Sequence, residues 1–159
     1  MILLRSHGFT FIELMVTLAI LGVLALLAVP VAEYSVRRDQ ERELRRALIE
    51  IRAAIDAYKR ASEQGRIMVP PGESGYPRTL EELASGVIDQ RSPVRQRIYF
   101  LRRVPVDPFS ANPRVRPSET WGLRSYVSSP DLPLAGKDVF DVYSRSAGIG
   151  LNGVPYREW

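Results

Sequence analysis

An almost uncharged apolar run near the N-terminus constrains this chain more than any other feature. It covers residues 9–32, and Glu13 is the one charged residue among these 24. A helix of that length reaches about 36 Å at about 1.5 Å per residue, which exceeds the roughly 30 Å hydrocarbon core of a bilayer. A carboxylate in such a segment is costly unless it is paired. The run therefore predicts a membrane-spanning helix with a functional carboxylate near its start.

The residues around Gly8 resemble a known processing signal. Residues 1–8, with the basic Arg5, precede the sequence Phe-Thr-Phe-Ile-Glu-Leu and the apolar run. This arrangement resembles the class III signal of type IV prepilins and type II secretion pseudopilins. An ordinary secretory signal, with a shorter apolar region and a small-residue cleavage site after it, is the alternative that hydropathy alone leaves open.

The resemblance implies roles for Gly8, Phe9 and Glu13. Prepilin peptidase would cleave between Gly8 and Phe9 and methylate the new amine of Phe9. Glu13 would become the fifth residue of the mature chain and would meet the amine of a neighbouring subunit, setting the axial register of a filament. Opposite charges attract strongly at low dielectric, although desolvation offsets most of the gain. The alternative is a solvated Glu13 at the headgroup boundary.

Pro30 falls where the family commonly has a proline in its long N-terminal helix. A proline there removes a backbone hydrogen bond and clashes with the preceding turn, so a kink is expected. The alternative is that Pro30 simply marks the boundary between the membrane segment and the periplasmic segment.

The helix is expected to continue over residues 33–64, where neither Gly nor Pro occurs, with Gly65 as its C-terminal cap. One apolar stripe recurs at spacings of 4, 3, 4 and 3 residues, and charged residues occupy the opposite face. The stripe consists of Leu44, Leu48, Ile51, Ile55 and Tyr58, and the charged face of Arg45, Arg46, Glu50, Arg52, Asp56 and Lys59. Such a stripe requires the rest of the chain to cover it.

Residues 65–159 read as loops, a short helix and strands. Thr79 or Arg78 is the expected cap of a helical turn or two, in a stretch that resembles an element of major pseudopilins. Residues 97–109 resemble a second such element, and Asp107-Pro108 within it favours a turn with a structural role.

The predicted fold class is α+β, with a long N-terminal helical spine and a small C-terminal antiparallel sheet packed on its second half. The strand candidates are residues 121–128 and 139–144, which are rich in aromatic and β-branched side chains. A third strand is expected from residues 154–159 or from residues around Arg114.

Four segments are expected along the chain: a leader (1–8), a transmembrane assembly helix (9–32), an amphipathic helix (33–64) and a periplasmic head (65–159). Residues 33–159 suit one globular domain. By the resemblance, the chain would cross the inner membrane once, with its C-terminal domain in the periplasm.

The composition argues against catalysis. The chain has no cysteine, and its one histidine, His7, lies in the expected leader. The mature chain would thus lack both residues, and no Gly-rich phosphate loop occurs. No enzymatic activity is predicted.

A basic cluster over residues 91–103 is interleaved with aromatic side chains. That combination is compatible with DNA binding. We expect Tyr99, Phe100 and Leu101 to belong instead to the local core, so a nucleic-acid partner is not predicted.

The C-terminal loop departs from the major pseudopilins it resembles, whose acidic loop holds calcium. No Asp or Glu lies between Ser144 and Arg157. Because calcium prefers several hard oxygen ligands, typically including carboxylates, no calcium and no other cofactor is predicted. Gly148, Gly150 and Gly153 are expected to serve turns, and Trp159 to pack.

Taken together, these features predict a structural subunit of a type II secretion pseudopilus that drives export of folded proteins. Its partners would be further copies, other pseudopilins, prepilin peptidase and an inner-membrane assembly platform. The alternatives are a minor type IV pilin or DNA-uptake pseudopilin, and a generic signal-anchored periplasmic protein.

Overall fold

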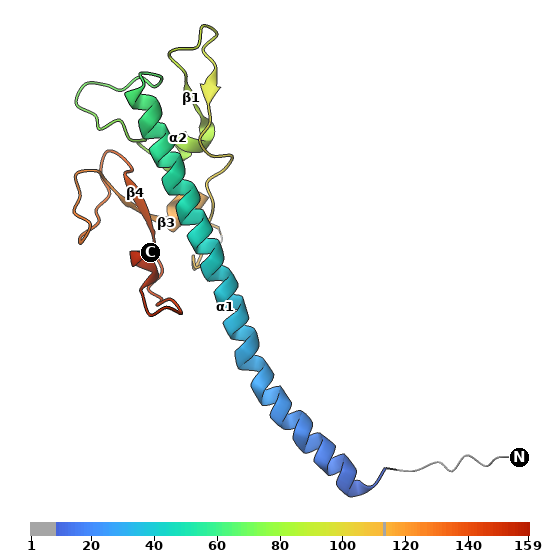
Figure 1. Cartoon of the computed structure of the whole chain (residues 1–159). Coiled ribbons are helices and arrows are strands. Elements are labelled where there is room, and N and C mark those ends of the chain that lie inside the picture. Colours follow the sequence, from blue (N-terminus) through green and yellow to red (C-terminus); the bar gives the residue numbers. More distant parts are fainter. Residues whose placement is uncertain (1–8, 113) are drawn as a thin grey trace, which may run out of the picture. The chain divides into compact units, whose positions relative to one another are not determined.

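The computed structural model describes residues 9–112 and 114–159, except for the side chains of residues 27–31. Two compact units make up the chain, Met1–Asp39 and Gln40–Trp159. The predicted leader, including Gly8, lies outside the described residues. The long helix α1 begins at Phe11 and ends at Glu63 (Figure 1).

In the first unit, α1 confirms the helix expected over the apolar run. The large apolar side chains from Phe11 to Leu26 are more than half exposed, from 52% at Val16 to 78% at Phe11. A bilayer-crossing length of apolar helix is not found among the described residues. Pro30 is within the bounds of α1, but its side chain is among those not described, and its kink remains a prediction.

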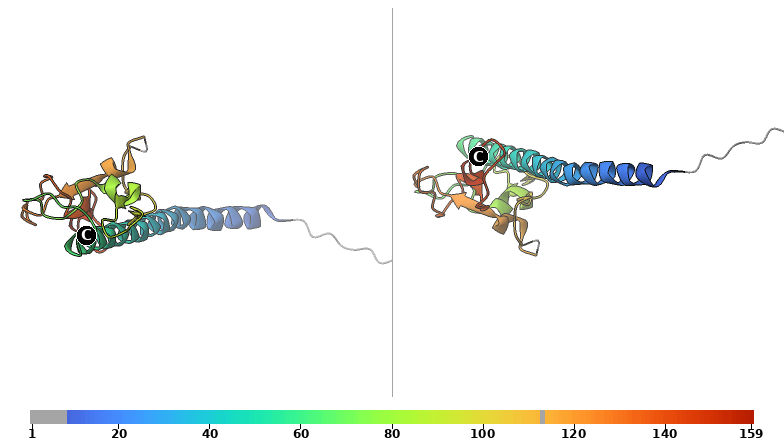
Figure 2. Two further views of the ribbon diagram at one scale, coloured as in Figure 1. Left: turned by 90° about the horizontal axis from the view of Figure 1, so that it is seen from above. Right: turned by 90° about the horizontal axis from the view of Figure 1, so that it is seen from below.

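In the second unit, residues 40–63 of α1 bury the predicted apolar stripe. Leu44 and Ile51 are fully buried, and Leu48, Ile55 and Tyr58 are at most 7% exposed. The later elements lie along one side of this part of α1 (Figures 1 and 2). They complete the core with Leu80, Leu83, Leu101, Trp121, Val139, Val142 and Tyr156.

Both predicted helix caps are confirmed in position, although the Thr79 side chain makes no capping hydrogen bond. At the end of α1, Gly65 has a φ of +67°, its N–H donates to the carbonyl of Ser62, and the N–H of Arg66 donates to that of Ala61. This is a Schellman motif, for which glycine is best suited. The short helix α2 (Leu80–Ser85) has Thr79 in extended conformation at its N-cap.

Within residues 9–112 and 114–159, the strands form two separate two-stranded antiparallel sheets. Strand β1 (Val87–Ile88) pairs with β2 (Arg97–Ile98). Strand β3 (Trp121–Arg124) pairs with β4 (Asp141–Ser144), with Trp121 opposite Ser144 and Arg124 opposite Asp141. The two strand candidates are therefore confirmed in shortened form.

The third strand that we expected does not form in the described part of the chain. Residues 156–158 instead make the 3-10 helix η2 (Tyr156–Glu158), after Pro155, which has no N–H to donate to a sheet. Near Arg114, the chain turns into the 3-10 helix η1 (Pro117–Thr120). Strand β3 ends at Arg124 because a turn begins at Ser125. In this turn, the carbonyl of Ser125 accepts a hydrogen bond from the N–H of Ser128 at 3.0 Å.

The Asp107-Pro108 turn has the structural role predicted for it. The Asp107 side chain is 2% exposed. Its Oδ1 accepts from the N–H of Phe109 at 2.8 Å, and its Oδ2 accepts from the hydroxyl of Ser144 at 2.6 Å. The turn is thereby joined to strand β4.

Asp138 joins the loop before β4 to two other segments. It accepts hydrogen bonds from the hydroxyl of Ser125 at 2.6 Å, from the N–H of Tyr126 at 2.9 Å, and from the hydroxyl of Ser74. Burial acts to raise the pKa of Asp138, but these hydrogen bonds outweigh it, so the pKa lies below its ordinary value.

The aromatic stretch after β2 is only partly the local core that we expected. Leu101 is buried, and the ring of the half-buried Phe100 lies 5.4 Å from that of Tyr58. Tyr99 is 61% exposed, so its assignment to the core is wrong. The N–H groups of both Phe100 and Leu101 donate to the carbonyl of Leu83. These two hydrogen bonds hold Phe100 and Leu101 against the core, whereas the side chain of Tyr99 stays outside it.

Candidate processing and assembly site

Thr10 and Glu13 cap the N-terminus of α1 reciprocally. The Thr10 hydroxyl accepts from the N–H of Glu13 at 3.3 Å, and the Glu13 carboxylate accepts from the N–H of Thr10 at 3.4 Å. The carbonyl of Thr10 accepts the first helical hydrogen bond, from Leu14, at 3.1 Å. This is a capping box, which satisfies two donors that a helix start otherwise leaves unpaired. Sequence reasoning missed this local role of Glu13, although the Thr-x-x-Glu pattern before an apolar run was the signal for it.

Of the predicted processing residues the structure describes Phe9, and of the predicted assembly residues it describes Glu13 with its side chain. Phe9 precedes the helix and is 81% exposed, and Glu13 is exposed in its first turn. Three residues therefore lie between the exposed Phe9 and a carboxylate that already caps the helix start. In the first unit, the structure brings these two predicted residues together at one end of α1.

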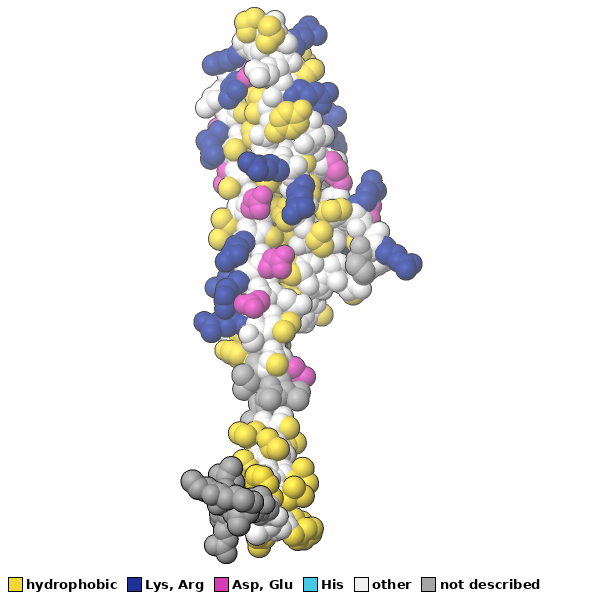
Figure 3. Space-filling model, turned by 90° about the vertical axis from the view of Figure 1, so that its right-hand side faces the viewer, with side chains coloured by type: hydrophobic (Ala, Val, Ile, Leu, Met, Phe, Trp, Pro, Cys, Tyr) yellow, Lys and Arg dark blue, Asp and Glu magenta, His cyan; other side chains and the backbone are white. Residues whose placement is uncertain are grey.

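Apolar side chains surround the rest of this part of α1. Phe11, Ile12, Leu18 and Leu26 are each at least 67% exposed, and the face seen in Figure 3 is dominated by hydrophobic side chains there. A helix that is apolar on all sides is normally buried in a protein core or in lipid.

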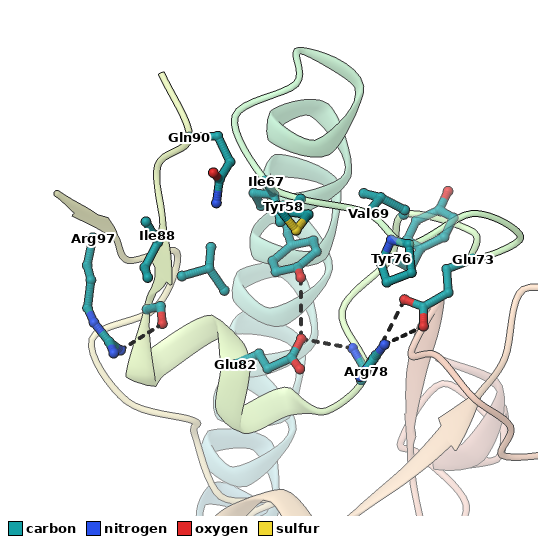
Figure 4. A pocket seen from close by; sticks show the side chains of 15 residues that line it. Tyr58, Ile67, Val69, Glu73, Tyr76, Arg78, Glu82, Ile88, Gln90 and Arg97 are labelled. Atoms are coloured by element: carbon teal, nitrogen blue, oxygen red, sulfur yellow. Dashed lines mark hydrogen bonds and ion pairs between the residues drawn. The ribbon is translucent and has the colours of Figure 1, made fainter. Parts of the chain in front are cut away.

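At the other end of α1, a cavity of about 400 Å³ lies in the second unit (Figure 4). The hydroxyl of Tyr58 donates to the Glu82 carboxylate at 3.4 Å, which also accepts from the N–H of Arg78 at 3.0 Å. Arg78 in turn forms an ion pair with Glu73. Burial, followed by the charge of Glu82, raises the pKa of Tyr58 to about 12. The phenol is therefore protonated at neutral pH and is not poised as a base or nucleophile.

The basic cluster of residues 91–103 is partly used to hold the head together. Arg97 donates to the carbonyls of Ser85 and Gly86 at 3.1 and 3.2 Å, so it joins β2 to the end of α2. Just outside the cluster, Arg66 forms an ion pair with Asp89 at 2.7 Å. The hydrogen bonds that Arg66 donates lower the pKa of the Asp89 carboxyl. Arg91, Arg95, Arg102 and Arg103 remain exposed.

The N-terminal region defines the class of protein. Residues 3–29 match the family model described as the prokaryotic N-terminal methylation motif. This match and the capped apolar helix place the chain among the type IV pilin-like proteins.

Two relatives identify the family within that class. The chain is 31% identical over 157 residues to the type II secretion system core protein G of Dickeya chrysanthemi, covering 94% of this chain and 95% of the relative. It is 30% identical over 141 residues to the protein of that name from Klebsiella pneumoniae, covering 85% and 93%. The chain belongs to the type II secretion system core protein G family of pseudopilins. No solved structure matches it.

This membership favours the secretion pseudopilin that we expected over a minor pilin or DNA-uptake pseudopilin. The match of residues 3–29 also supports the predicted prepilin leader and methylation. It does not test the roles assigned to the individual residues.

Proposed function

We propose that this chain is a filament-forming subunit of a type II secretion pseudopilus. Cleavage after Gly8 and methylation of Phe9 would produce a mature chain anchored once in the inner membrane, with its C-terminal domain in the periplasm. An inner-membrane platform would then assemble it with further copies and other pseudopilins, so that the growing filament drives export of folded proteins.

The uncovered apolar helix carries this proposal. Phe11 and Leu26, at the two ends of its described apolar part, are 78% and 77% exposed. Burying apolar surface contributes about 25 cal/mol per Å², so a helix apolar on all sides is not stable in water alone. Lipid before assembly and neighbouring helices after it would both provide cover. A filament subunit drawn from a membrane requires such a helix.

Glu13 is proposed to change partners on assembly. In the single chain, its carboxylate accepts from the N–H of Thr10 at 3.4 Å, which is a long hydrogen bond. A methylated ammonium from a neighbouring Phe9 would be a stronger partner, worth about 4 kcal/mol at 4 Å and an effective dielectric of about 20, before desolvation. The pair would fix the axial register between subunits.

A structural role, rather than a catalytic one, is supported by the second unit. Its cavity beside Tyr58 contains a protonated phenol and carboxylates engaged with Arg78. The relatives of this chain carry the name type II secretion system core protein G.

Intact-mass measurement of the protein purified from membranes tests the processing. We expect a chain that lacks residues 1–8 and carries one methyl group on Phe9. Retention of the leader, or cleavage after the apolar run, would refute the proposal in favour of an ordinary signal or anchor.

The role of Glu13 needs a separate variant. Glu13→Gln keeps an acceptor for the N–H of Thr10 and removes only the charge. We expect this variant to be cleaved and yet to fail in filament assembly and secretion, whereas Glu33→Gln, at an exposed acid of the same unit, behaves as wild type. Normal filaments from Glu13→Gln would refute the register role and leave the processing intact.

A further inference from the structure

One buried carboxylate of α1 holds the C-terminal loop. Glu41 is 7% exposed, although it lies in a stretch of alternating charges. Its Oε1 accepts from the N–H of Leu151 at 2.7 Å and from the hydroxyl of Tyr156 at 3.0 Å. These partners follow Glu41 by more than 100 residues, so this acid joins the end of the chain to α1.

Arg52 makes a second attachment roughly three helical turns further along α1. Its guanidinium donates to Oδ1 of Asp141 at 2.8 Å, to the carbonyl of Val142 at 3.1 Å and to the backbone oxygen of Trp159 at 2.7 Å. A single side chain thus contacts strand β4 and the last residue. Its planar fork of donors suits such multiple bonding.

Ring packing completes the closure. Tyr156 stacks on Phe109 with ring centroids 4.2 Å apart, and Trp159 meets Tyr156 edge-on at 5.1 Å. The guanidinium of Arg45 lies 4.3 Å from the ring of Trp159. Within the loop, the N–H of Gly150 donates to the carbonyl of Val154 at 2.8 Å. Protein groups therefore hold both ends of the loop.

The donor set of this region does not suit calcium, which takes six to eight oxygen ligands that usually include carboxylates. The two oxygens of Asp141 are engaged by Arg52 at 2.8 Å and by Arg124 at 3.2 Å. A cavity of about 810 Å³ beside the loop is also lined by Arg145 and Arg157. This lining combines four guanidinium groups with the carboxylates of Asp131, Asp141 and Glu158, so its basic groups outnumber its acidic ones. Within the described residues, no group of three His, Cys, Asp or Glu is placed to hold a metal.

We propose that Glu41 and Arg52 form a metal-free latch on the C-terminal loop, that is, a closure of this loop onto α1 made by protein groups alone. The head then closes without calcium. The latch is carried by contacts within the second unit, so it stands or falls independently of the proposed processing and secretion role.

The first test compares the wild-type full-length protein, in detergent, with millimolar CaCl₂ and with excess EGTA. Hydrogen exchange of the Leu151 amide reports directly on the Glu41 contact, and thermal unfolding reports on the head. We expect the same exchange rate and the same Tm in both conditions. Slower exchange or a higher Tm in calcium would overturn the proposal.

The second test removes the carboxylate. In Glu41→Ala, we expect the Leu151 amide to exchange about 10-fold to about 100-fold faster, which is the factor expected for a lost hydrogen bond to a charged acceptor. Glu43→Ala is the matched control, because Glu43 is exposed on the same helix. In this variant, the Leu151 amide should exchange at the wild-type rate. Equal exchange in the two variants would overturn the latch.

Two milder variants keep the test decisive if Glu41→Ala does not fold. Tyr156→Phe removes the hydroxyl that donates to Glu41 and should speed Leu151 exchange severalfold. Glu41→Gln retains an acceptor and should stay closer to wild type than Tyr156→Phe does. If Leu151 exchanged faster in Glu41→Gln than in Tyr156→Phe, hydrogen bonding by Glu41 would not be the means by which the loop closes.

Discussion

Removing the Asp107 side chain tests whether one buried carboxylate organises the junction between the Asp-Pro turn and strand β4. Asp107→Ala deletes the acceptor of the Phe109 N–H, at 2.8 Å, and of the Ser144 hydroxyl, at 2.6 Å. Ser144 is fully buried, so water cannot readily replace the missing partner.

The expected cost follows from these two stranded donors. A buried donor without a partner costs about 1–3 kcal/mol. Two of them predict a loss of about 2–6 kcal/mol, depending on how far the turn relaxes. Against a typical domain stability of about 5–15 kcal/mol, this is a large fraction. Adding Ser144→Ala to Asp107→Ala removes the unpaired hydroxyl of Ser144. The double variant Asp107→Ala/Ser144→Ala should therefore be more stable than the sum of the two single effects predicts, by about 1 kcal/mol or more.

Equilibrium unfolding in urea, followed by tryptophan fluorescence, measures the free energy of unfolding of each variant. Trp121 is 2% exposed, and its indole N–H donates to the carbonyl of Pro105 at 2.8 Å, so it reports on the neighbourhood of Asp107. Asp131→Ala, at an exposed acid, is the control. If Asp107→Ala unfolds within about 0.5 kcal/mol of wild type, or adds simply to Ser144→Ala, the hydrogen-bond reasoning is wrong.

Three further predictions follow from the core and the head. Ile51→Ala should cost about 2–5 kcal/mol in the same urea assay, because Ile51 is fully buried; Ile49→Ala, at a residue 68% exposed, should change little. Gly122→Ala would bring a Cβ within 2.3 Å of the Tyr143 ring and should destabilise the chain by about 1–3 kcal/mol, unless Tyr143→Ala is added. The lowered pKa of Asp138 stabilises the fold above the unfolded-state pKa, so Tm should fall as pH drops from about 5, and Asp138→Asn should flatten that dependence; an unchanged profile would contradict it.

Local patterns in the sequence predicted the elements whose causes are local. The stripe that includes Leu44 and Ile51 is buried as the helical period requires. Gly65 caps α1, and Thr79 occupies the N-cap position of α2, because the backbone conformations of these positions are set by neighbouring residues. Strand lengths were overestimated, because Ser125 starts a turn that depends on contacts with distant residues.

Arg52 shows the limit of periodicity at the candidate sites. Helical spacing placed it on the charged outer face, yet its side chain is only 38% exposed and contacts residues about 90 to 107 positions away. The sequence around Glu41 likewise gave no indication of a buried contact, since alternating charges are typical of a solvated helix face. Neither contact has a signature in the sequence, because both depend on where the chain returns to α1.

The sequence by itself determined the processing motif, the apolar helix with its single carboxylate, and the amphipathic stripe, because each depends on spacing along one helix. It also determined that the C-terminal loop lacks acids. Only the tertiary structure decided what takes their place. Glu41 and Arg52 reach the loop because folding brings residues more than 100 positions apart into hydrogen-bond distance, and no pattern along the chain encodes that meeting.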